Sequence, residues 1–393
     1  MRIPRMRTPH WPIILLVLLL VGASACGSPQ SGERGGKIAF PDSNLNLVNA
    51  DGGTPTVRPE SFGVGGLVWS PDGSKVAFND SDSVSTYISV VRADGSHYVR
   101  VFDNQNSGVS YTWSGTSDQL AYDWADVIFV VRADGSGRRK LVDGDFPSWS
   151  PDGRMIAFIR GTFIRVINSD GTADRKLVRL DSGHDCFTVL WSSDSRKIAC
   201  TTSAWKNPKY IIESGGDRIM DQGASTLLCH VHIIDVGRRS HVQVVGGGLL
   251  GTFYNQCDIG WSPDGKQIAF NRNGSLYAVS ADGKRERRLG RGFSPSWAPD
   301  GSHIAVQLGG AFQPNATISV INVQRLEEHR VAPANALSWS PDGKAFVIAR
   351  RVKSPAQDEY VIETFAADGG RLRRIWPTAG LTCQCGEPAW QPR

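Results

Sequence analysis

The pentapeptide Trp69-Ser-Pro-Asp-Gly73 decides the fold, because it returns along the chain with the same neighbours. The apolar triplet Val76-Ala-Phe78 follows it after two residues. Pro presets the first turn position, Gly supplies a positive φ and Asp caps the turn, so each copy predicts a tight turn between two strands. Identical pentapeptides begin at Trp149, Trp261 and Trp339, near copies begin at Trp113, Trp191 and Trp297, and a truncated copy begins at Trp390.

A second turn marker, of which Ala93-Asp-Gly95 is the clearest copy, follows each triplet. A short apolar run precedes this marker and a basic-apolar run, such as residues 138–142, follows it. Each unit therefore predicts four strands. Strand A ends at the Trp, B holds the triplet, C precedes Asp-Gly and D follows it. Units recur every 36–51 residues, except for 70 residues between Trp191 and Trp261, and this pattern is typical of a β-propeller.

The two ends of the chain complete each other. Residues 37–59 supply strands B, C and D without an A, and residues 386–391 supply an A alone. We therefore expect an all-β ring of eight blades, closed by the C-terminal strand A pairing with the N-terminal strands. Seven blades is the alternative, if the unit at Trp113 or the one at 191–261 is irregular.

Composition agrees with many short strands joined by turns. Gly occurs 43 times and Trp 12 times in 393 residues. Length alone predicts two or three domains. The repeats instead place residues 37–393 in one propeller domain, with an insertion at about 203–227.

The first 25 residues have the pattern of a signal peptide. Arg2, Arg5 and Arg7 precede the apolar stretch 13–22, which is too short to span a bilayer, and Ala23-Ser-Ala25 precedes Cys26. We expect cleavage before Cys26, lipidation of Cys26 and a short linker over 26–36. Plain secretion and an uncleaved anchor are the alternatives. Lipidation of Cys26 leaves six other Cys, an even number suited to disulfides in an oxidising compartment.

Removing the signal peptide also removes most of the basic excess. The net charge of +5 includes its three Arg, and 40 basic against 38 acidic residues remain, a balance of +2. We therefore expect no nucleic-acid partner.

The repeats resemble the PD40 (WD40-like) repeats of TolB-like propellers, a match that covers about residues 37–391. The resemblance implies an envelope protein that works by protein–protein contact. The N-terminal α/β domain of that family has no counterpart before residue 37, so we expect fold, compartment and a binding role to carry over, but no contact residues.

Strand directions place the two uniform turns on one face and the variable B–C and D–A connections on the other. Variable loops on a rigid ring are where recognition usually occurs. The insertion and its neighbours carry aromatic and charged side chains, although packing on their own blade is an equal alternative. The candidate binding residues are Trp205, Tyr210, Arg218, Phe253, Tyr254, His184 and Asp185.

The Cys residues gather on the same variable face. Cys383 and Cys385 lie in the last D–A connection and can reach only each other. For the other four we predict Cys200–Cys229 with Cys186–Cys257. The close rival is Cys186–Cys200 with Cys229–Cys257.

Catalytic and cofactor motifs are missing from the sequence. It has no G-x-S-x-G, no phosphate-binding loop and no spaced acids of a calcium loop. His230 and His232 share one strand face near His184, and we expect surface or hydrogen-bonded histidines rather than a metal site. We therefore predict a monomeric binding or scaffold module with no cofactor and no catalytic residues, on the periplasmic or extracellular side of the membrane. Its partner is an envelope protein or a cell-wall glycan. The alternative is a lyase or hydrolase with a site in the central channel.

Overall fold

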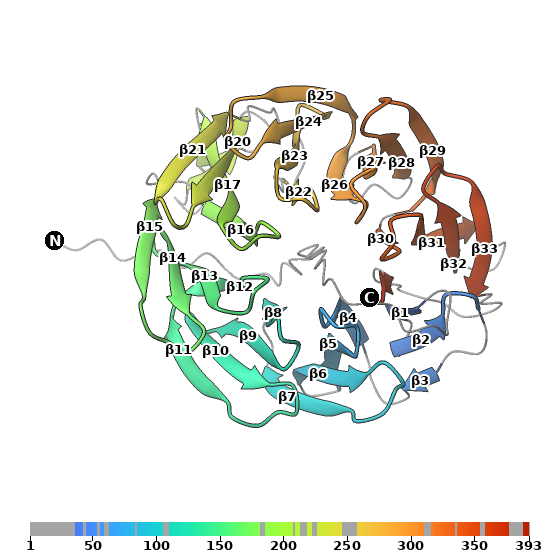
Figure 1. Ribbon diagram of the computed structural model, residues 1–393, viewed down its shortest axis with the longest axis horizontal. Coiled ribbons are helices and arrows are strands. Elements are labelled where there is room, and N and C mark those ends of the chain that lie inside the picture. Colours follow the sequence, from blue (N-terminus) through green and yellow to red (C-terminus); the bar gives the residue numbers. More distant parts are fainter. Residues whose placement is uncertain are drawn as a thin grey trace.

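The computed structural model describes residues 36–41, 45–52, 56–58, 63–82, 85–104, 110–180, 185–206, 209–212, 218–221, 226–245, 258–309, 316–334, 336–353, 358–376 and 388–392. Within these ranges every regular element is a strand. Eight four-stranded antiparallel sheets stand around a ring, as Figure 1 shows. The predicted all-β class and the count of eight blades are confirmed. Both units that could have been irregular form complete blades.

Each blade runs from an inner strand A near the ring axis to an outer strand D (Figure 1). Blades 1 to 4, in this order of strands, are β34(Ala389–Trp390), β1(Lys37–Pro41), β2(Leu45–Asn49) and β3(Thr56–Arg58); β4(Gly63–Trp69), β5(Lys75–Ser81), β6(Thr86–Arg92) and β7(Val99–Asn104); β8(Tyr111–Trp113), β9(Gln119–Trp124), β10(Val127–Arg132) and β11(Arg139–Asp143); and β12(Asp145–Trp149), β13(Met155–Arg160), β14(Phe163–Asn168) and β15(Arg175–Arg179).

The second half of the ring repeats the same order. Blades 5 to 8 are β16(Asp185–Trp191), β17(Lys197–Lys206), β20(Thr226–Asp235) and β21(Ser240–Val245); β22(Ile259–Trp261), β23(Gln267–Arg272), β24(Ser275–Ser280) and β25(Glu286–Arg291); β26(Phe293–Trp297), β27(His303–Leu308), β28(Thr317–Asn322) and β29(Glu328–Pro333); and β30(Leu337–Trp339), β31(Ala345–Lys353), β32(Asp358–Ala366) and β33(Arg371–Trp376).

The ring closes in blade 1, where the two ends of the chain share a sheet. Ile38 of β1 pairs with Trp390 of β34. The side chain of Gln391 accepts from the backbone N–H of Lys37 at 2.7 Å and donates to the carbonyl of Gly73 in blade 2 at 2.7 Å. The predicted closure is therefore confirmed, and it is extended by a side-chain bridge to the next blade.

The pentapeptide turn is held by its own polar side chains. Ser70 Oγ donates to Asp72 Oδ1 at 2.6 Å and accepts from the backbone N–H of Lys75 at 3.0 Å. Gly73 has a φ of 67°, where a side chain would be strained. The same Ser-to-Asp bond forms at Ser150, Ser192, Ser262 and Ser340.

Two departures from the pentapeptide join neighbouring blades. Ser117 and Ser195 stand at the glycine position and keep positive φ values of 61° and 58°. The Ser117 hydroxyl accepts from the backbone N–H of Asp72 in the preceding blade at 3.0 Å, and Ser195 does the same for Asp152. A positive φ strains the backbone of these serines, and the inter-blade hydrogen bond that each hydroxyl accepts offsets part of that cost.

Inter-blade contacts repeat at the inner and outer edges of the ring. Six repeat Trp indoles donate to the carbonyl that precedes the Trp of the previous blade, namely Trp69, Trp113, Trp191, Trp261, Trp297 and Trp339, at 2.9–3.2 Å. Four Arg of outer strands donate to a carbonyl in the C–D turn of the next blade, namely Arg139, Arg175, Arg287 and Arg373. The repeat Trp therefore have a structural role at the boundaries between blades, and the apolar triplets are fully buried.

We call the face with the pentapeptide and Asp-Gly turns the turn face, and the opposite face, with the B–C and D–A connections, the loop face. β1 begins on the turn face, because its first residue, Lys37, pairs with Asn49 beside the Asp-Gly turn of blade 1. Two D–A connections on the loop face are single glycines. Gly144 joins β11 to β12, and Gly292 joins β25 to β26.

The predicted insertion contains more strand than expected. β17 and β20 continue into it and stay paired to Lys206 and Thr226. A further hairpin, β18(Lys209–Ile212) and β19(Arg218–Asp221), lies between them in the chain. The loop over 203–227 is thus largely a prolonged B–C hairpin, because both strands keep pairing beyond the blade.

Candidate functional site on the loop face

Asp123 joins two inner strands at the loop face. It lies near the end of β9, immediately after the apolar triplet of blade 3. Its carboxylate accepts from the backbone N–H of Ser110 at 3.0 Å and from that of Phe146 in blade 4 at 2.9 Å. Burial nevertheless raises its pKa above the usual value for Asp. Asp123 therefore fixes the start of both inner strands.

Asp145, the first residue of β12, is the most perturbed carboxyl of this region. Burial, and then the charges of Asp126 and Asp123, raise its pKa to about 6. Asp258 in blade 6 is a second case: burial raises its pKa, and the hydroxyl of Ser294 donates to it at 2.6 Å. The loop face thus presents carboxyl groups whose pKa values lie above the usual value for Asp.

An aromatic cluster lies at the boundary of blades 2 and 3, next in the sequence to Asp123 and Asp126. It consists of Phe102, Tyr122, Trp124 and Phe129, whose neighbouring ring centroids are 4.6–6.5 Å apart. Trp124 is 42% exposed, whereas Tyr122 is fully buried. The Arg138 guanidinium lies over two of the rings, 4.8 Å from the centroid of Phe102 and 4.7 Å from that of Phe129. The cluster is a rigid apolar surface with one cation on it.

The turn that follows Trp124 is strained. Ala125 and Asp126 both have positive φ, 51° and 61°. Blade 6 makes the equivalent turn with Asn273 and Gly274, the pair that suits this geometry. Blade 3 therefore keeps an unfavourable turn directly between the exposed indole and the carboxyls.

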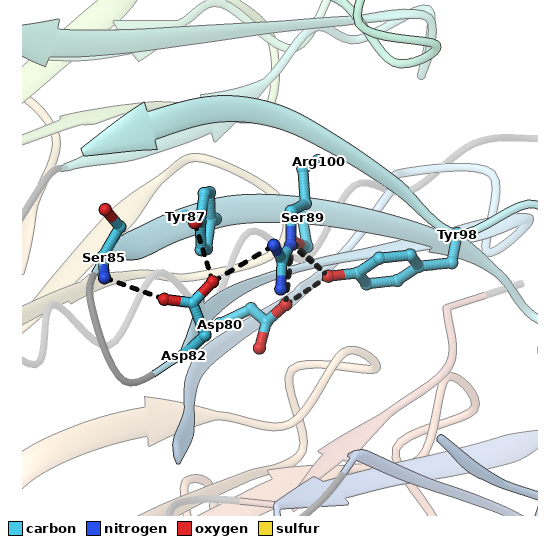
Figure 2. A network of polar contacts seen from close by, with 7 residues as sticks. All are labelled: Asp80, Asp82, Ser85, Tyr87, Ser89, Tyr98 and Arg100. Atoms are coloured by element: carbon cyan, nitrogen blue, oxygen red, sulfur yellow. Dashed lines mark hydrogen bonds and ion pairs between the residues drawn. The ribbon is translucent and has the colours of Figure 1, made fainter. Parts of the chain in front are cut away.

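Figure 2 shows a third polar arrangement, in blade 2, where Asp80 is 1% exposed. The hydroxyl of Tyr98 donates to Asp80 Oδ2, and the hydroxyl of Ser89 lies 3.4 Å from the same atom. Arg100 spans the group, with Nε 3.8 Å from Asp80 and Nη1 3.3 Å from Asp82. These contacts neutralise a buried carboxylate, so this network is structural.

Three of the predicted binding residues lie on strands of the blade 5 insertion. Trp205 pairs with Leu227 in the β17–β20 ladder, and Tyr210 pairs with Met220 in the β18–β19 hairpin. Arg218 begins β19 and Asp185 begins β16. The side chains of these four, together with His184, Phe253 and Tyr254, lie outside what the structure describes, so their binding role stays a prediction. The sequence reasoning missed Trp124, although a Trp before a B–C turn is the available signal.

The strand register argues against the predicted Cys200–Cys229 pairing. Cys200 pairs with His232, and Cys229 pairs with Ser203, three positions further along β17. Three residues of strand span about 10 Å. A disulfide needs Cα atoms within about 7 Å. This register therefore counts against the Cys200–Cys229 pairing, which stays a prediction.

The rival pairing brings its first two residues nearer. Cys186 pairs with Thr202, two positions from Cys200 and on the same face of the sheet. Such diagonal neighbours are about 7–8 Å apart, at the limit of a bridge. Cys26, Cys257, Cys383 and Cys385 lie outside the described residues, so their predicted lipidation and pairings stay predictions.

His232 is buried and uses both ring nitrogens. Nδ1 lies 2.8 Å from His241 Nε2, and Nε2 lies 2.9 Å from the Thr202 hydroxyl. Its ring centroid is 6.5 Å from that of His230. These contacts agree with the predicted hydrogen-bonded histidine. No group of three His, Cys, Asp or Glu in the described ranges has metal-binding geometry.

The fold and these features define an eight-bladed β-propeller with an aromatic and acidic loop face. No family model and no curated protein matches the sequence. Among solved structures, a eukaryotic initiation factor matches with a TM-score of 0.54 and 11% identity, over 92% of this chain and 99% of its own. An oligogalacturonate lyase in complex with manganese matches with a TM-score of 0.48 and 12% identity, over 80% of this chain and 88% of its own. TolB from Acinetobacter baumannii matches with a TM-score of 0.39 and 14% identity, over 80% of this chain and 82% of its own.

The likeness to these three proteins concerns the propeller fold alone, since all the identities are low. Across the described part of the chain, no helix is long and apolar enough to cross a membrane.

Proposed function

We propose that the chain is an exported binding module, anchored by a lipid on Cys26 to the outer side of the cell membrane. Its loop face contacts an envelope protein or a cell-wall glycan. The observation that supports this proposal most directly is the aromatic cluster, in which an exposed Trp124 rests on the buried Phe102 ring and the half-buried Phe129 ring.

The composition of the cluster is the one found at binding hot spots. Trp and Arg carry much of the binding energy at interfaces. The rigid indole of Trp buries a large area at low entropic cost. The rings of Phe102 and Phe129, over which Arg138 lies, contact the Trp124 indole before any partner arrives, which lowers the entropic cost of ordering it on binding. The neighbouring carboxyls of Asp126 and Asp145 can accept hydrogen bonds from amides or hydroxyls. This combination suits a polar partner with apolar faces.

The test measures binding of the full-length mature protein to isolated cell-wall sacculi and to solubilised envelope proteins. We expect Trp124→Ala to weaken binding about tenfold or more, the usual size of a hot-spot loss. Leu326→Ala is the matched control, since Leu326 is 49% exposed but lies between β28 and β29 on the turn face. Equal binding of wild type and Trp124→Ala, with both folded, contradicts the proposal.

A second candidate function is catalysis near the ring axis, as in propeller lyases or hydrolases. Asp145 favours it, because a carboxyl with a pKa of about 6 can exchange protons near neutral pH. Turnover of a cell-wall or acidic polysaccharide by the wild type, lost in Asp145→Asn with the fold retained, would establish it. Intact polysaccharide after incubation with the wild type, with and without divalent metals, rejects it.

A further inference from the structure

The outer strands carry a repeated irregularity. In six blades the C–D pairing shifts by one residue at the same place, which leaves an apolar D-strand residue as a β-bulge. Leu289 is an example, since Leu276 pairs with Gly290 and Tyr277 with Arg288. The residue before the bulge is basic in all six blades, namely Arg100, Lys140, Lys176, Arg288, Arg330 and Arg374.

These six cations are exposed and belong to a strongly basic surface, which we call the outer wall. The eight D strands together carry fourteen Lys and Arg but only four Asp and Glu. The mature chain as a whole is nearly balanced, with 40 basic and 38 acidic residues. Charge is therefore segregated toward the circumference. The four inter-blade arginines of the outer edge account for only part of this excess.

Carboxylates offset some of the six cations. Arg100 contacts Asp80 and Asp82 (Figure 2). Lys140 pairs with Asp143 at 2.6 Å, and Arg374 lies 3.8 Å from Glu363.

The other three cations are Lys176, Arg288 and Arg330, and they form no ion pair within the described ranges. Lys176 lies over the Phe163 ring, 4.2 Å from its centroid. These three side chains lie in blades 4, 6 and 7 and keep their charge available.

We propose that the outer wall binds a linear polyanion, a polymer with a phosphate or carboxylate in each repeat, which follows the circumference. A flat membrane or a globular protein can touch only neighbouring blades at one time, whereas the cations stand around the ring (Figure 1). A flexible chain can meet them in succession and release bound counterions at each contact. Both Lys and Arg suit such anions. This site is separate from the loop face and does not depend on its function.

The test titrates the full-length mature protein with long-chain polyphosphate and, separately, with polygalacturonate. We expect affinity for at least one polymer to fall steeply with salt, by about 0.7 log units per contact for each tenfold rise. Inorganic phosphate and vesicles of anionic phospholipid serve as comparisons. Which polymer binds distinguishes phosphate from carboxylate as the ligand group.

The decisive variant is Lys176→Gln/Arg288→Gln/Arg330→Gln. Near 50 mM salt each lost contact is expected to weaken binding about tenfold. The control Arg92→Gln/Arg154→Gln/Arg196→Gln removes the same charge from exposed residues of the turn face, and its binding should change little. All six residues are exposed, so both variants should keep the melting temperature of the wild type.

Three outcomes overturn the proposal. The first is no binding of either polymer near 50 mM salt. The second is an equal loss in the two triple variants, which would make net charge the cause. The third is binding to anionic vesicles without binding to either polymer.

Discussion

Replacing Asp145 by Asn should stabilise the protein at neutral and higher pH. The substitution keeps the shape of the side chain and removes a charge that burial and neighbouring carboxylates disfavour. The pKa rises on folding from 3.8 to about 6. The folded state therefore binds the proton more tightly than the unfolded state. The wild type therefore loses stability as the pH rises from about 4 through about 6, because Asp145 gives up its proton over this range. The variant has no proton to lose at this position, so its stability does not fall for this reason.

The expected magnitude follows from the shift. Two pKa units correspond to about 3 kcal/mol. Asp145 is only half-buried and solvent screens its charge, so we expect about 1 kcal/mol at pH 8. Urea unfolding of wild type and Asp145→Asn, followed by Trp fluorescence at constant salt, measures the difference. Near pH 4 the two midpoints should approach each other.

Asp126→Asn is the companion variant. It removes one of the charges that raise the pKa of Asp145, so it should recover part of the same gain at pH 8. The reasoning is refuted if Asp145→Asn is less stable than wild type at pH 8. It is also refuted if the difference between them is the same at pH 4 and pH 8.

Three further predictions concern the ring. Trp191→Phe removes an inter-blade hydrogen bond, whereas Trp149→Phe does not, because the buried Trp149 indole has no acceptor within the described residues; in urea unfolding the first should cost about 1 kcal/mol more than the second, and equal costs would contradict this role. Gly144→Ala places a Cβ 2.6 Å from the Phe158 ring, so we expect a loss of about 2 kcal/mol and a lower melting temperature; an unchanged melting temperature would refute the close packing. Replacing Ala125-Asp126 by Asn-Gly should raise stability by about 1 kcal/mol in thermal melts, since that pair suits the turn, and a lower melting temperature would show that the native pair makes a compensating contact.

The sequence predicted the ring well because the repeat carries local information. The Trp, the Ser-Pro-Asp-Gly turn and the apolar triplet each dictate a strand end, a turn or a buried strand, so the blades could be counted. Closure through residues 386–391 followed because blade 1 lacked only its inner strand. Ser117 and Ser195 looked like decay of the motif, although each of them bonds to the preceding blade.

The candidate site was harder to predict because it depends on neighbouring blades and on register. The pKa of Asp145 is raised by burial and then by the charges of Asp126 and Asp123 in the preceding blade, all of which depend on the folded ring. The Cys200–Cys229 pairing was proposed without the register, since the register over β17 and β20 could not be read from the sequence. The basic pattern of the D strands was visible, but its place before a bulge on the outer wall was not.

The position at which the chain enters the ring has a consequence for how the molecule stands at the cell surface. β1 begins on the turn face, and residues 27–36 separate it from Cys26, a span of at most about 35 Å. If Cys26 is lipidated as proposed, this short linker keeps the turn face toward the bilayer. Trp124 and the long hairpin of blade 5 then point outward to whatever lies beyond the membrane. The outer wall then lies perpendicular to the plane of the membrane, so that a polymer can reach it from any direction around the ring.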